Sequence, residues 1–296
     1  MTAARRALRF GVCLAPDASA PLVRIAQDAD RYGLDLLGVR DEPYRRDTAD
    51  AVAVMATALA VTSRIRVLPA VACLPLRPPA ALAKAAATLD RLSGGRVELG
   101  LGAGRAPDGI DDYGGARLDA AAAHRALEEA VQVIRLHWSD QSGLRFTGAH
   151  YRFAAAQAGP VPAHQIGVWL GVTGPRGLGL AGRVADGWLA PSSLVPPKRL
   201  ADGQRRLDEA ALAADRDPGE IRRGYVLEGS LDGQGAQGFL HGPPGRWIDE
   251  MTELAVGHRV DTFLFGGDPE QFPVFALEVV PAVRDQVTRE RGAVSV

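Results

Sequence analysis

The stretch SGGRVELGLGAG, Ser93–Gly104, places glycines at alternate positions, Gly100, Gly102 and Gly104, at the end of a short strand-forming run. In a Rossmann fold, a GxGxxG sequence opens a helix directly and binds dinucleotide phosphates. Here the pattern is GxGxG, and the sequence that follows, APDGIDDYGG, is predicted to be a loop. The pattern therefore gives dinucleotide binding little support. Two interpretations remain: the glycines admit a flat ligand close to the backbone at a barrel rim, or they permit tight packing inside the barrel.

The run that ends at Gly102 is one of eight similar runs. Each is apolar or β-branched, and a stretch with apolar residues at helical spacing follows it. The runs cover residues 8–14, 34–40, 65–71, 96–102, 166–171, 187–190, 221–228 and 261–266. The helical stretches cover residues 20–31, 47–62, 78–92, 119–137, 175–184, 197–214, 244–257 and 269–288. Eight strand–helix units in 296 residues predict an α/β fold, a (β/α)8 TIM-type barrel.

No domain boundary is needed, so residues 1–296 are predicted to form a single barrel domain with insertions at the carboxyl-terminal face of the strands. Residues 138–165 depart from the repeat. Within them, LRFTGAHYRF predicts two short strands around Thr147-Gly148, a surface hairpin. The glycine-rich residues 228–243 are a second irregular segment.

Composition excludes several classes of function. The net charge is −1 and the basic residues are scattered, which argues against nucleic acid as a partner. No apolar run approaches the roughly 20 residues that span a membrane, and the amino terminus does not resemble a signal peptide, so we expect a cytoplasmic protein with no membrane partner. Cys13 and Cys73 lack CxxC spacing and are expected to be buried thiols. The six histidines occur singly, so no metal site is predicted.

In a (β/α)8 barrel the active site lies at the carboxyl-terminal ends of the strands. One strand end carries Gly171, Val172, Thr173 and Gly174, and Pro175 follows at the first position of a predicted helix. The amides of such a helix start, together with the Thr173 hydroxyl, can bind an anion. An ordinary capped helix start explains the same residues equally well.

Two stretches together, LRPPAALAKAAATLDRLSGGRVELGLGAG (76–104) and IGVWLGVTGPRGLGLAGRVADGW (166–188), resemble the bacterial luciferase-like flavin-dependent oxidoreductases. That family includes deazaflavin (F420) enzymes and FMN enzymes. The resemblance implies a barrel that binds F420 or FMN and passes hydride to or from a small organic substrate, as a dehydrogenase, reductase or monooxygenase. The Ala-, Gly- and Arg-rich composition favours F420 slightly. A flavin reductase partner, if FMN is the cofactor, and a homodimer are further implications.

The resemblance also assigns residues to the cofactor site. Residues 171–174 match the family's loop that binds the cofactor phosphate. Ala70-Val71 matches a bulge that supports the face of the ring and that in the family often holds a non-prolyl cis peptide. Gly102 and Gly104 match the strand end beneath the ring, and Asp41 matches a residue beside the cofactor.

Two positions depart from the family pattern. Where relatives commonly have Asp-His after the second strand, this chain has Asp41-Glu42, and where some F420 enzymes have an acid after GxGxG it has Arg105. We expect Glu42 to replace the histidine as acid or base and Arg105 to bind an anionic group. Two alternatives stay open: the two residues form a solvated pair at the rim, or the chain is a non-redox member, a binding protein or lyase-like enzyme.

Overall fold

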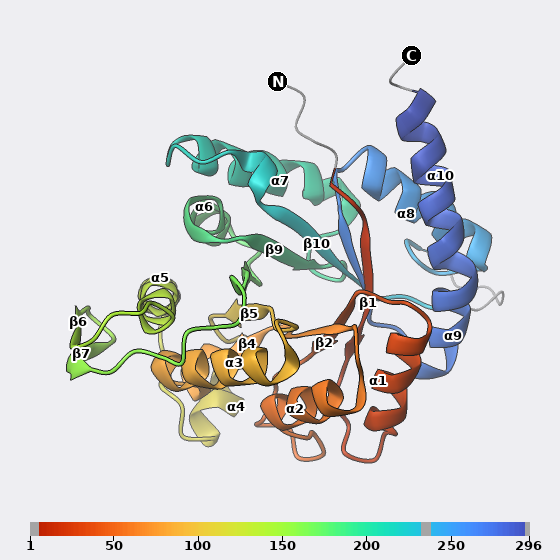
Figure 1. The fold of residues 1–296 in the computed structure, drawn as a ribbon. Helices are drawn as coiled ribbons and strands as arrows, with labels where there is room; N and C mark the ends of the chain where they lie inside the picture. The colour runs from red at the N-terminus through yellow and green to blue at the C-terminus, as the bar shows by residue number, and fades with distance from the viewer. Residues whose placement is uncertain (1–5, 232–237, 294–296) are drawn as a thin grey trace.

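The apolar runs form strands that are buried on both faces, as parallel strands are when helices cover them outside and side chains fill a barrel inside. The computed structural model describes residues 6–231 and 238–293 (Figure 1). The strands that form the barrel wall are β1 Arg9–Leu14, β2 Leu36–Val39, β3 Arg66–Pro69, β4 Ala72–Cys73, β5 Leu99–Gly102, β8 Val168–Leu170, β9 Gly187–Pro191, β10 Arg222–Leu227 and β11 Thr262–Phe265.

The sheet closes on itself through the third strand position. The strand order is β3-β2-β1-β11-β10-β9-β8-β5-β4, and all its pairs are parallel. The segments β3 and β4 are two halves of one strand position, interrupted at Ala70 and Val71. Near the start of that position Val67 bridges Val97, and beyond the interruption Ala72 pairs with Leu101. Eight strand positions therefore surround one interior, and the predicted (β/α)8 barrel is confirmed.

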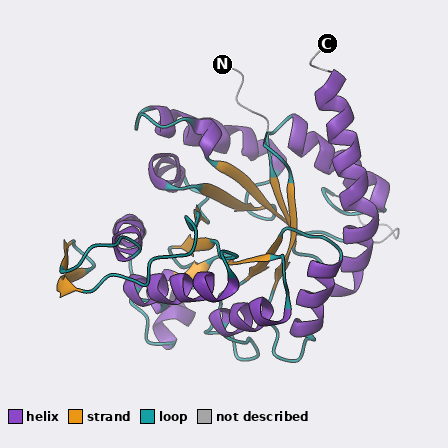
Figure 2. Cartoon of the chain, viewed as in Figure 1, coloured by secondary structure: helices purple, strands orange, loops and turns teal. Residues whose placement is uncertain are grey.

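Helices cover the outside of the barrel, as Figure 2 shows. They are α1 Leu22–Arg31, α2 Ala51–Val61, α3 Pro79–Ser93, α5 Ala120–His137, α6 Pro175–Val184, α7 Pro197–Leu212, α8 Pro244–Val256 and α10 Val280–Ala293. Proline stands in the first turn of α3, α6, α7 and α8, where a helix needs no N–H. The side chains of Asp50 and Asp119 cap α2 and α5.

Two predicted elements differ from the structure. The sequence after Gly104, predicted as a loop, contains the short helix α4 Pro107–Asp112, which begins at a proline. The predicted helix 269–288 is divided into the 3₁₀ turn η3 Pro269–Gln271, α9 Phe272–Val274, the π-helical turn η4 Phe275–Val279, and α10. The π turn lies just before Pro281, which has no N–H to donate to the carbonyl one turn earlier. Short 3₁₀ turns also occur at η1 Leu74–Leu76 and η2 Pro218–Glu220.

The hairpin predicted around Thr147-Gly148 is present. Strands β6 Leu144–Thr147 and β7 Arg152–Ala156 pair antiparallel and lie away from the barrel wall (Figure 1). Because the hairpin follows α5, it leaves the barrel on the side where helices return to strands. Residues 103–119 and 228–243 follow strands instead, at the carboxyl-terminal face. Residues 232–237 of the second segment lie outside the described part of the chain.

The interior of the barrel is a packed apolar column. The inner cluster is Cys13, Leu36, Leu68, Trp169, Leu189, Val226 and Leu264, and Ala70 and Val71 pack on it. At the amino-terminal end, buried Glu98 lies 3.3 Å from Arg9 and accepts a hydrogen bond from the Trp169 indole. The amino-terminal end is thus closed by an ion pair. Among the described helices, none is both long and apolar enough to cross a membrane.

Candidate active site

The Ala70–Val71 peptide lies at the carboxyl-terminal end of the barrel and is cis, as expected from the resemblance. It separates β3 from β4, so the chain at this point pairs with β2 before the interruption and with β5 after it. Both side chains are half-buried and pack on the inner apolar cluster. The two side chains therefore form the upper surface of the packed interior. A ligand bound at this end of the barrel would rest on that surface, which we call the floor of the site.

Glycines on the neighbouring strands make room for Val71. A Cβ atom on Gly102 would lie 2.5 Å from Val71 Cγ2, and one on Gly171 would lie 2.9 Å from both Val71 Cγ atoms. A Cβ on Gly38 would similarly meet Ala70 Cβ at 3.1 Å. Contacts below 3.0 Å require something to move, so Gly102 and Gly171 require glycine or a displacement of Val71, whereas at Gly38 a shift of a few tenths of an ångström would suffice. Of the two interpretations of the GxGxG run, close packing is the one these distances directly support at Gly102.

Gly104 has a different role. Its φ is +87°, a conformation that favours glycine, and a Cβ there would lie 2.6 Å from Ile110 Cδ1 in α4. The backbone turns at this residue from the barrel wall into the segment that carries α4. Gly104 therefore shapes the rim, and its predicted contact with a cofactor stays a prediction.

Asp41 ties the end of β2 to the segment after the cis peptide. Its buried carboxylate accepts a hydrogen bond from the amide of Cys73 at 2.9 Å and two from the Arg77 guanidinium, both at 2.7 Å. Arg77 also pairs with Asp50 at 2.6 Å. These bonds occupy both carboxylate oxygens of Asp41, so within this structure the residue positions the Ala70–Val71 segment. Its contact with a cofactor stays a prediction.

The segment from Gly171 to Gly174 is held by its neighbours, with its helix start left open. The Gly171 amide donates to Leu101, the Val172 carbonyl accepts from the Trp188 indole at 2.8 Å, and the Val172 side chain packs where a Cβ on Gly177 would lie. Thr173 and Gly174 are exposed, and a Cβ on Gly174 would meet no atom within 4 Å. A preorganised segment of this kind loses little conformational entropy when it binds an anion.

The first amides of α6 have no acceptor in the described chain. Gly174 is the N-cap residue and supplies no side chain, and the first backbone hydrogen bond of the helix runs from the Leu178 amide to the Gly174 carbonyl. The amides of Thr173, Gly174, Arg176 and Gly177 are therefore available to an anion, at the end of the helix where the dipole favours negative charge. Every helix start leaves such amides free, so the anion site at this segment stays a prediction.

Glu42 lies at the carboxyl-terminal face in a small polar group. Its carboxylate is 3.1 Å from Arg45 Nε, and its side chain is 28% exposed. Burial, the charge of Glu42 and a hydrogen bond to Glu42 all raise the pKa of Tyr44 above its ordinary value. The Tyr44 ring packs against α4, because a Cβ on Gly109 would lie 2.9 Å from Tyr44 Cδ2. Tyr44 thus joins the loop after β2 to the loop after β5.

Arg105 is exposed at the start of the segment that follows β5. Glu42 pairs with Arg45, and no partner for the Arg105 guanidinium occurs in the described residues, so the two predicted site residues do not form a pair with each other. The Arg105 side chain is free to bind an anion.

Sequence reasoning missed a second polar group at the same face. Arg40, which directly precedes Asp41, pairs with Glu228 at 2.5 Å, and Glu228 follows β10. Burial raises the pKa of the Cys13 thiol, although Arg40 beside it acts in the opposite direction. The position of Arg40 and Glu228 directly after strands was a signal in the sequence, but their pairing across 188 residues was not.

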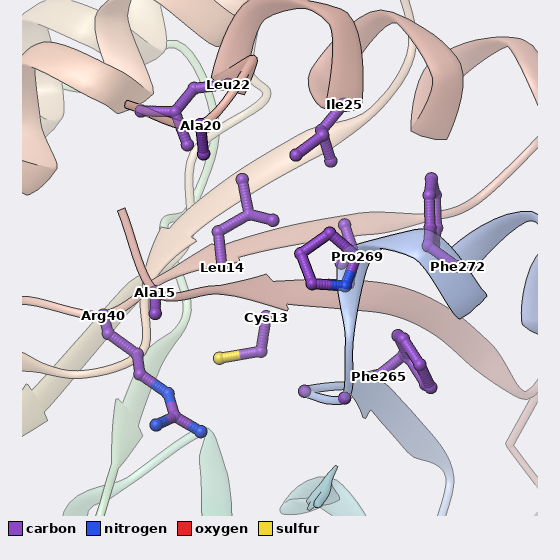
Figure 3. Close-up of a pocket in the computed structure, with 13 residues that line it drawn as sticks. Cys13, Leu14, Ala15, Ala20, Leu22, Ile25, Arg40, Phe265, Pro269 and Phe272 are labelled. Carbon is purple, nitrogen blue, oxygen red and sulfur yellow. The ribbon is translucent and has the colours of Figure 1, made fainter. Parts of the chain in front are cut away.

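A cavity of about 110 Å³ adjoins this second group (Figure 3). It lies between the carboxyl-terminal ends of β1 and β11, the start of α1 and residues 265–272. Figure 3 shows the Arg40 guanidinium on the same side of β1 as the Cys13 thiol. The floor at Val71, the open start of α6 and the Glu42 and Arg40 groups together make the carboxyl-terminal face the candidate active site.

The sequence profile of the luciferase-like monooxygenase family matches residues 8–229, most of the barrel. The chain belongs to this family. A curated relative, the F420-dependent glucose-6-phosphate dehydrogenase of Nakamurella multipartita, is 30% identical over 221 residues, which are 68% of this chain. The match spans 65% of that relative's length.

Solved structures share the fold. An F420-dependent secondary alcohol dehydrogenase, solved with an F420-acetone adduct, has a TM-score of 0.85 at 21% identity and covers 95% of this chain and 100% of its own. The oxygenating constituent of 3,6-diketocamphane monooxygenase from Pseudomonas putida, solved with FMN, has a TM-score of 0.76 at 16% identity and covers 93% of this chain and 98% of its own. At these identities the likeness establishes the barrel alone.

Proposed function

We propose that this protein is an F420-dependent oxidoreductase that passes hydride between the deazaflavin and a small organic substrate. The observation that carries the proposal is the pairing, at one end of one barrel, of the apolar surface formed by Ala70 and Val71 with the open amides that begin α6. The first offers a flat apolar floor and the second an anion site. A phosphorylated tricyclic cofactor needs both.

The residues fit such a cofactor. The amides of Thr173, Gly174, Arg176 and Gly177 would hold its phosphate, and the space beside Gly174 leaves that approach unobstructed. Val71, fixed between Gly102 and Gly171, would support the ring. Hydride acceptance and donation are the chemistry that a bound deazaflavin or flavin supplies.

The chain itself would supply proton transfer and substrate binding. We assign proton transfer to Glu42, with the Tyr44 hydroxyl beside it, because a carboxylate in hydrogen-bond reach of a phenol can pass a proton to or from a substrate oxygen. Arg105, which has no partner among the described residues, would bind an anionic group of substrate or cofactor. Asp41 would keep the floor in place through Cys73 and Arg77.

FMN is the second candidate cofactor. It is supported by the structural likeness to a monooxygenase solved with FMN, whereas the name of the Nakamurella relative supports F420. An FMN enzyme of the monooxygenase type would also need reduced flavin from a separate flavin reductase. A homodimer remains a proposal that sedimentation would test.

Separate titrations of the purified protein with F420 and with FMN, followed by cofactor fluorescence, test the proposal. We expect saturable binding of F420 and binding of FMN at least tenfold weaker. Tighter binding of FMN than of F420 would overturn F420 as the cofactor and favour an FMN-dependent oxidoreductase. Binding of neither would overturn the redox function and leave the non-redox alternative.

A further inference from the structure

The Arg40 side chain projects into the mouth of the barrel, not onto its outer surface. The β2 ladder continues through this residue, because its amide donates to the Leu14 carbonyl at 2.9 Å. On the other side of β2, the Val39 carbonyl accepts from the Ala70 amide at 2.7 Å. Side chains alternate along such a strand, so Arg40 lies on the same side as Gly38, whose Cβ would meet Ala70 Cβ at 3.1 Å. Arg40 therefore stands one step above the floor.

The Arg40 head group shares its support with the floor. It lies beside the thiol of Cys13, a member of the inner apolar cluster on which Ala70 and Val71 also pack (Figure 3). Across the mouth the guanidinium pairs with Glu228 at 2.5 Å, although β1 and β11 lie between β2 and β10 in the sheet. The guanidinium and the floor are thus neighbouring parts of one surface, polar at one side and apolar at the other.

Glu228 holds the guanidinium in place and is itself fixed from behind. Its second carboxylate oxygen accepts from the amide of Ser193 at 3.3 Å, and its own amide donates to the Ser192 hydroxyl at 2.9 Å. A guanidinium has five N–H donors, and only Glu228 and Cys13 engage that of Arg40 in the described residues. Arg40 therefore offers preorganised donors to a ligand, and the pair carries no net charge.

The floor lies between Arg40 and the open start of α6. Helix α6 follows β8, and the sheet runs from β8 through β5 and the β3–β4 position to β2. Val71 fills the space beside Gly171 on the β8 side, and Ala70 meets the space beside Gly38 on the β2 side. A cofactor with its phosphate at α6 and its ring on the floor would therefore have one edge of the ring toward Arg40.

The chemistry of the ring selects the edge that fits. Deazaflavin and flavin share a pyrimidinedione ring, whose carbonyl oxygens accept hydrogen bonds, while the opposite end of the ring system is a benzene ring. A neutral carbonyl can accept from Arg40 without displacing Glu228, because the bond needs no countercharge. The benzene end would leave the free N–H donors of Arg40 without an acceptor.

We propose that Arg40 binds the carbonyl edge of the pyrimidinedione ring and so fixes which way the cofactor ring lies on the floor. Arg40 is then a binding residue for the ring, and Glu228 is a positioning residue that acts through Arg40. The inference rests on the proposed function, because it takes the phosphorylated cofactor as the ligand. It adds a second polar anchor, on the side of the floor away from α6.

The test separates the ring from the phosphate. F420 and its phosphate-free deazaflavin–ribitol fragment are titrated into each protein and followed by fluorescence. Arg40→Met with Glu228→Gln removes the donors without leaving an unpaired charge, and should weaken both ligands about five- to tenfold. Gly174→Leu should weaken F420 alone. Arg183→Met with Glu128→Gln, which removes the ion pair between α6 and α5, is the matched control and should change neither affinity.

Two results would overturn the assignment of Arg40 and leave the proposed function standing. One is native affinity for the fragment in the Arg40/Glu228 double variant. The other is a loss confined to F420, because the partner would then be the phosphate. If the native protein binds FMN and not F420, FMN and riboflavin replace the two ligands, since they carry the same carbonyl edge. Binding of neither cofactor by the native protein would overturn the proposed function and this inference together.

The oxidation state of the cofactor distinguishes a ring contact from a merely structural pair. The reduced ring holds an additional electron pair, so its carbonyl oxygens are stronger acceptors for Arg40. The double variant should therefore lose about three- to fivefold more affinity for reduced F420 than for oxidised F420. Loss of a purely structural pair would weaken both forms alike, and that result would overturn the contact.

NMR of the native protein gives a readout that needs no folded double variant. Arginine side chains are ¹⁵N-labelled, and the Arg40 Nε–H signal is assigned by its absence in Arg40→Lys, which keeps a cation beside Glu228. The deazaflavin–ribitol fragment should shift this signal and leave that of Arg183, on the outer helices, unchanged. A saturating fragment that leaves the Arg40 signal in place would overturn the proposal.

Discussion

Val71 occupies the space that a side chain on Gly171 would need, since a Cβ there would lie 2.9 Å from both Val71 Cγ atoms. We therefore expect Gly171→Ala to lower the free energy of unfolding by about 1–3 kcal/mol, the usual cost of overpacking, and to weaken cofactor binding by displacing the floor. Urea unfolding and cofactor titration measure the two effects. Gly179→Ala is the control, because the nearest atom to a Cβ there is 3.7 Å away, at the end of Arg183. Unchanged stability in Gly171→Ala would contradict the packing argument.

The open start of α6 predicts unequal effects of two substitutions in the phosphate segment. Gly174→Leu should reduce cofactor affinity by at least a hundredfold, because its side chain would fill the space through which the amides are reached. Thr173→Ala removes one hydroxyl and should cost about 0.5–1.5 kcal/mol, a loss of roughly two- to tenfold. Fluorescence titration measures both. Native affinity in Gly174→Leu would refute the assignment of the phosphate to this segment.

Glu42 and Arg105 should affect different kinetic parameters. Glu42→Gln should lower kcat by about a hundredfold and leave KM nearly unchanged, because the amide cannot exchange the proton. Arg105→Ala should raise KM and leave cofactor affinity intact, because the residue has no partner to lose among the described residues. Glu209→Gln, on the exposed face of α7, is the control for loss of a carboxylate. If kcat/KM is native in both variants, neither residue belongs to the catalytic machinery.

Glu129 makes the hairpin at residues 144–156 sensitive to acid. Burial raises the pKa of Glu129, but hydrogen bonds from the amides of His150, Ala149 and Tyr151 outweigh it, so the pKa lies below its ordinary value near 4.5. A lowered pKa means that the stabilisation is complete above that ordinary value and is lost as the pH falls through the lowered one. Amide hydrogen exchange at residues 149–151, corrected for its intrinsic pH dependence, should therefore accelerate in that window.

Substitution separates this effect from general acid unfolding. In Glu129→Gln the accelerated exchange at residues 149–151 should already be present at neutral pH. Glu128→Gln changes the neighbouring carboxylate, which pairs with Arg183 instead, and should keep the native profile. Identical profiles in the two variants would show that Glu129 does not hold the hairpin.

Both cysteines should resist alkylation in the folded protein. Burial and the charge of Asp41 raise the pKa of Cys73 to about 11, so only about one thousandth of it is thiolate at pH 8. Burial also raises the pKa of Cys13. With iodoacetamide at pH 8, intact mass should show no label on the native protein and two labels after unfolding in guanidinium. Rapid native labelling at Cys13 would show that the barrel mouth opens further than in this structure.

The sequence alone determined the barrel. Eight apolar runs alternate with eight helical stretches, and both periodicities are local properties that the chain carries wherever it lies. The hairpin around Thr147-Gly148 followed from the same kind of local pattern. The π turn before Pro281 and the helix α4 were missed, because each depends on how the backbone satisfies its hydrogen bonds after packing.

The tertiary structure decided what the glycines and charges do. Val71, Gly102 and Gly171 come from three strand positions, so only closure of the barrel shows that the glycines make room for one side chain. Glu42 pairs with nearby Arg45, while Arg40 finds Glu228 at the far side of β1 and β11. The sequence shows which charged residues are present, but not which of them pair. Hydrogen bonds and packing contacts form only within a few ångströms, so the partners depend on where the fold places each side chain.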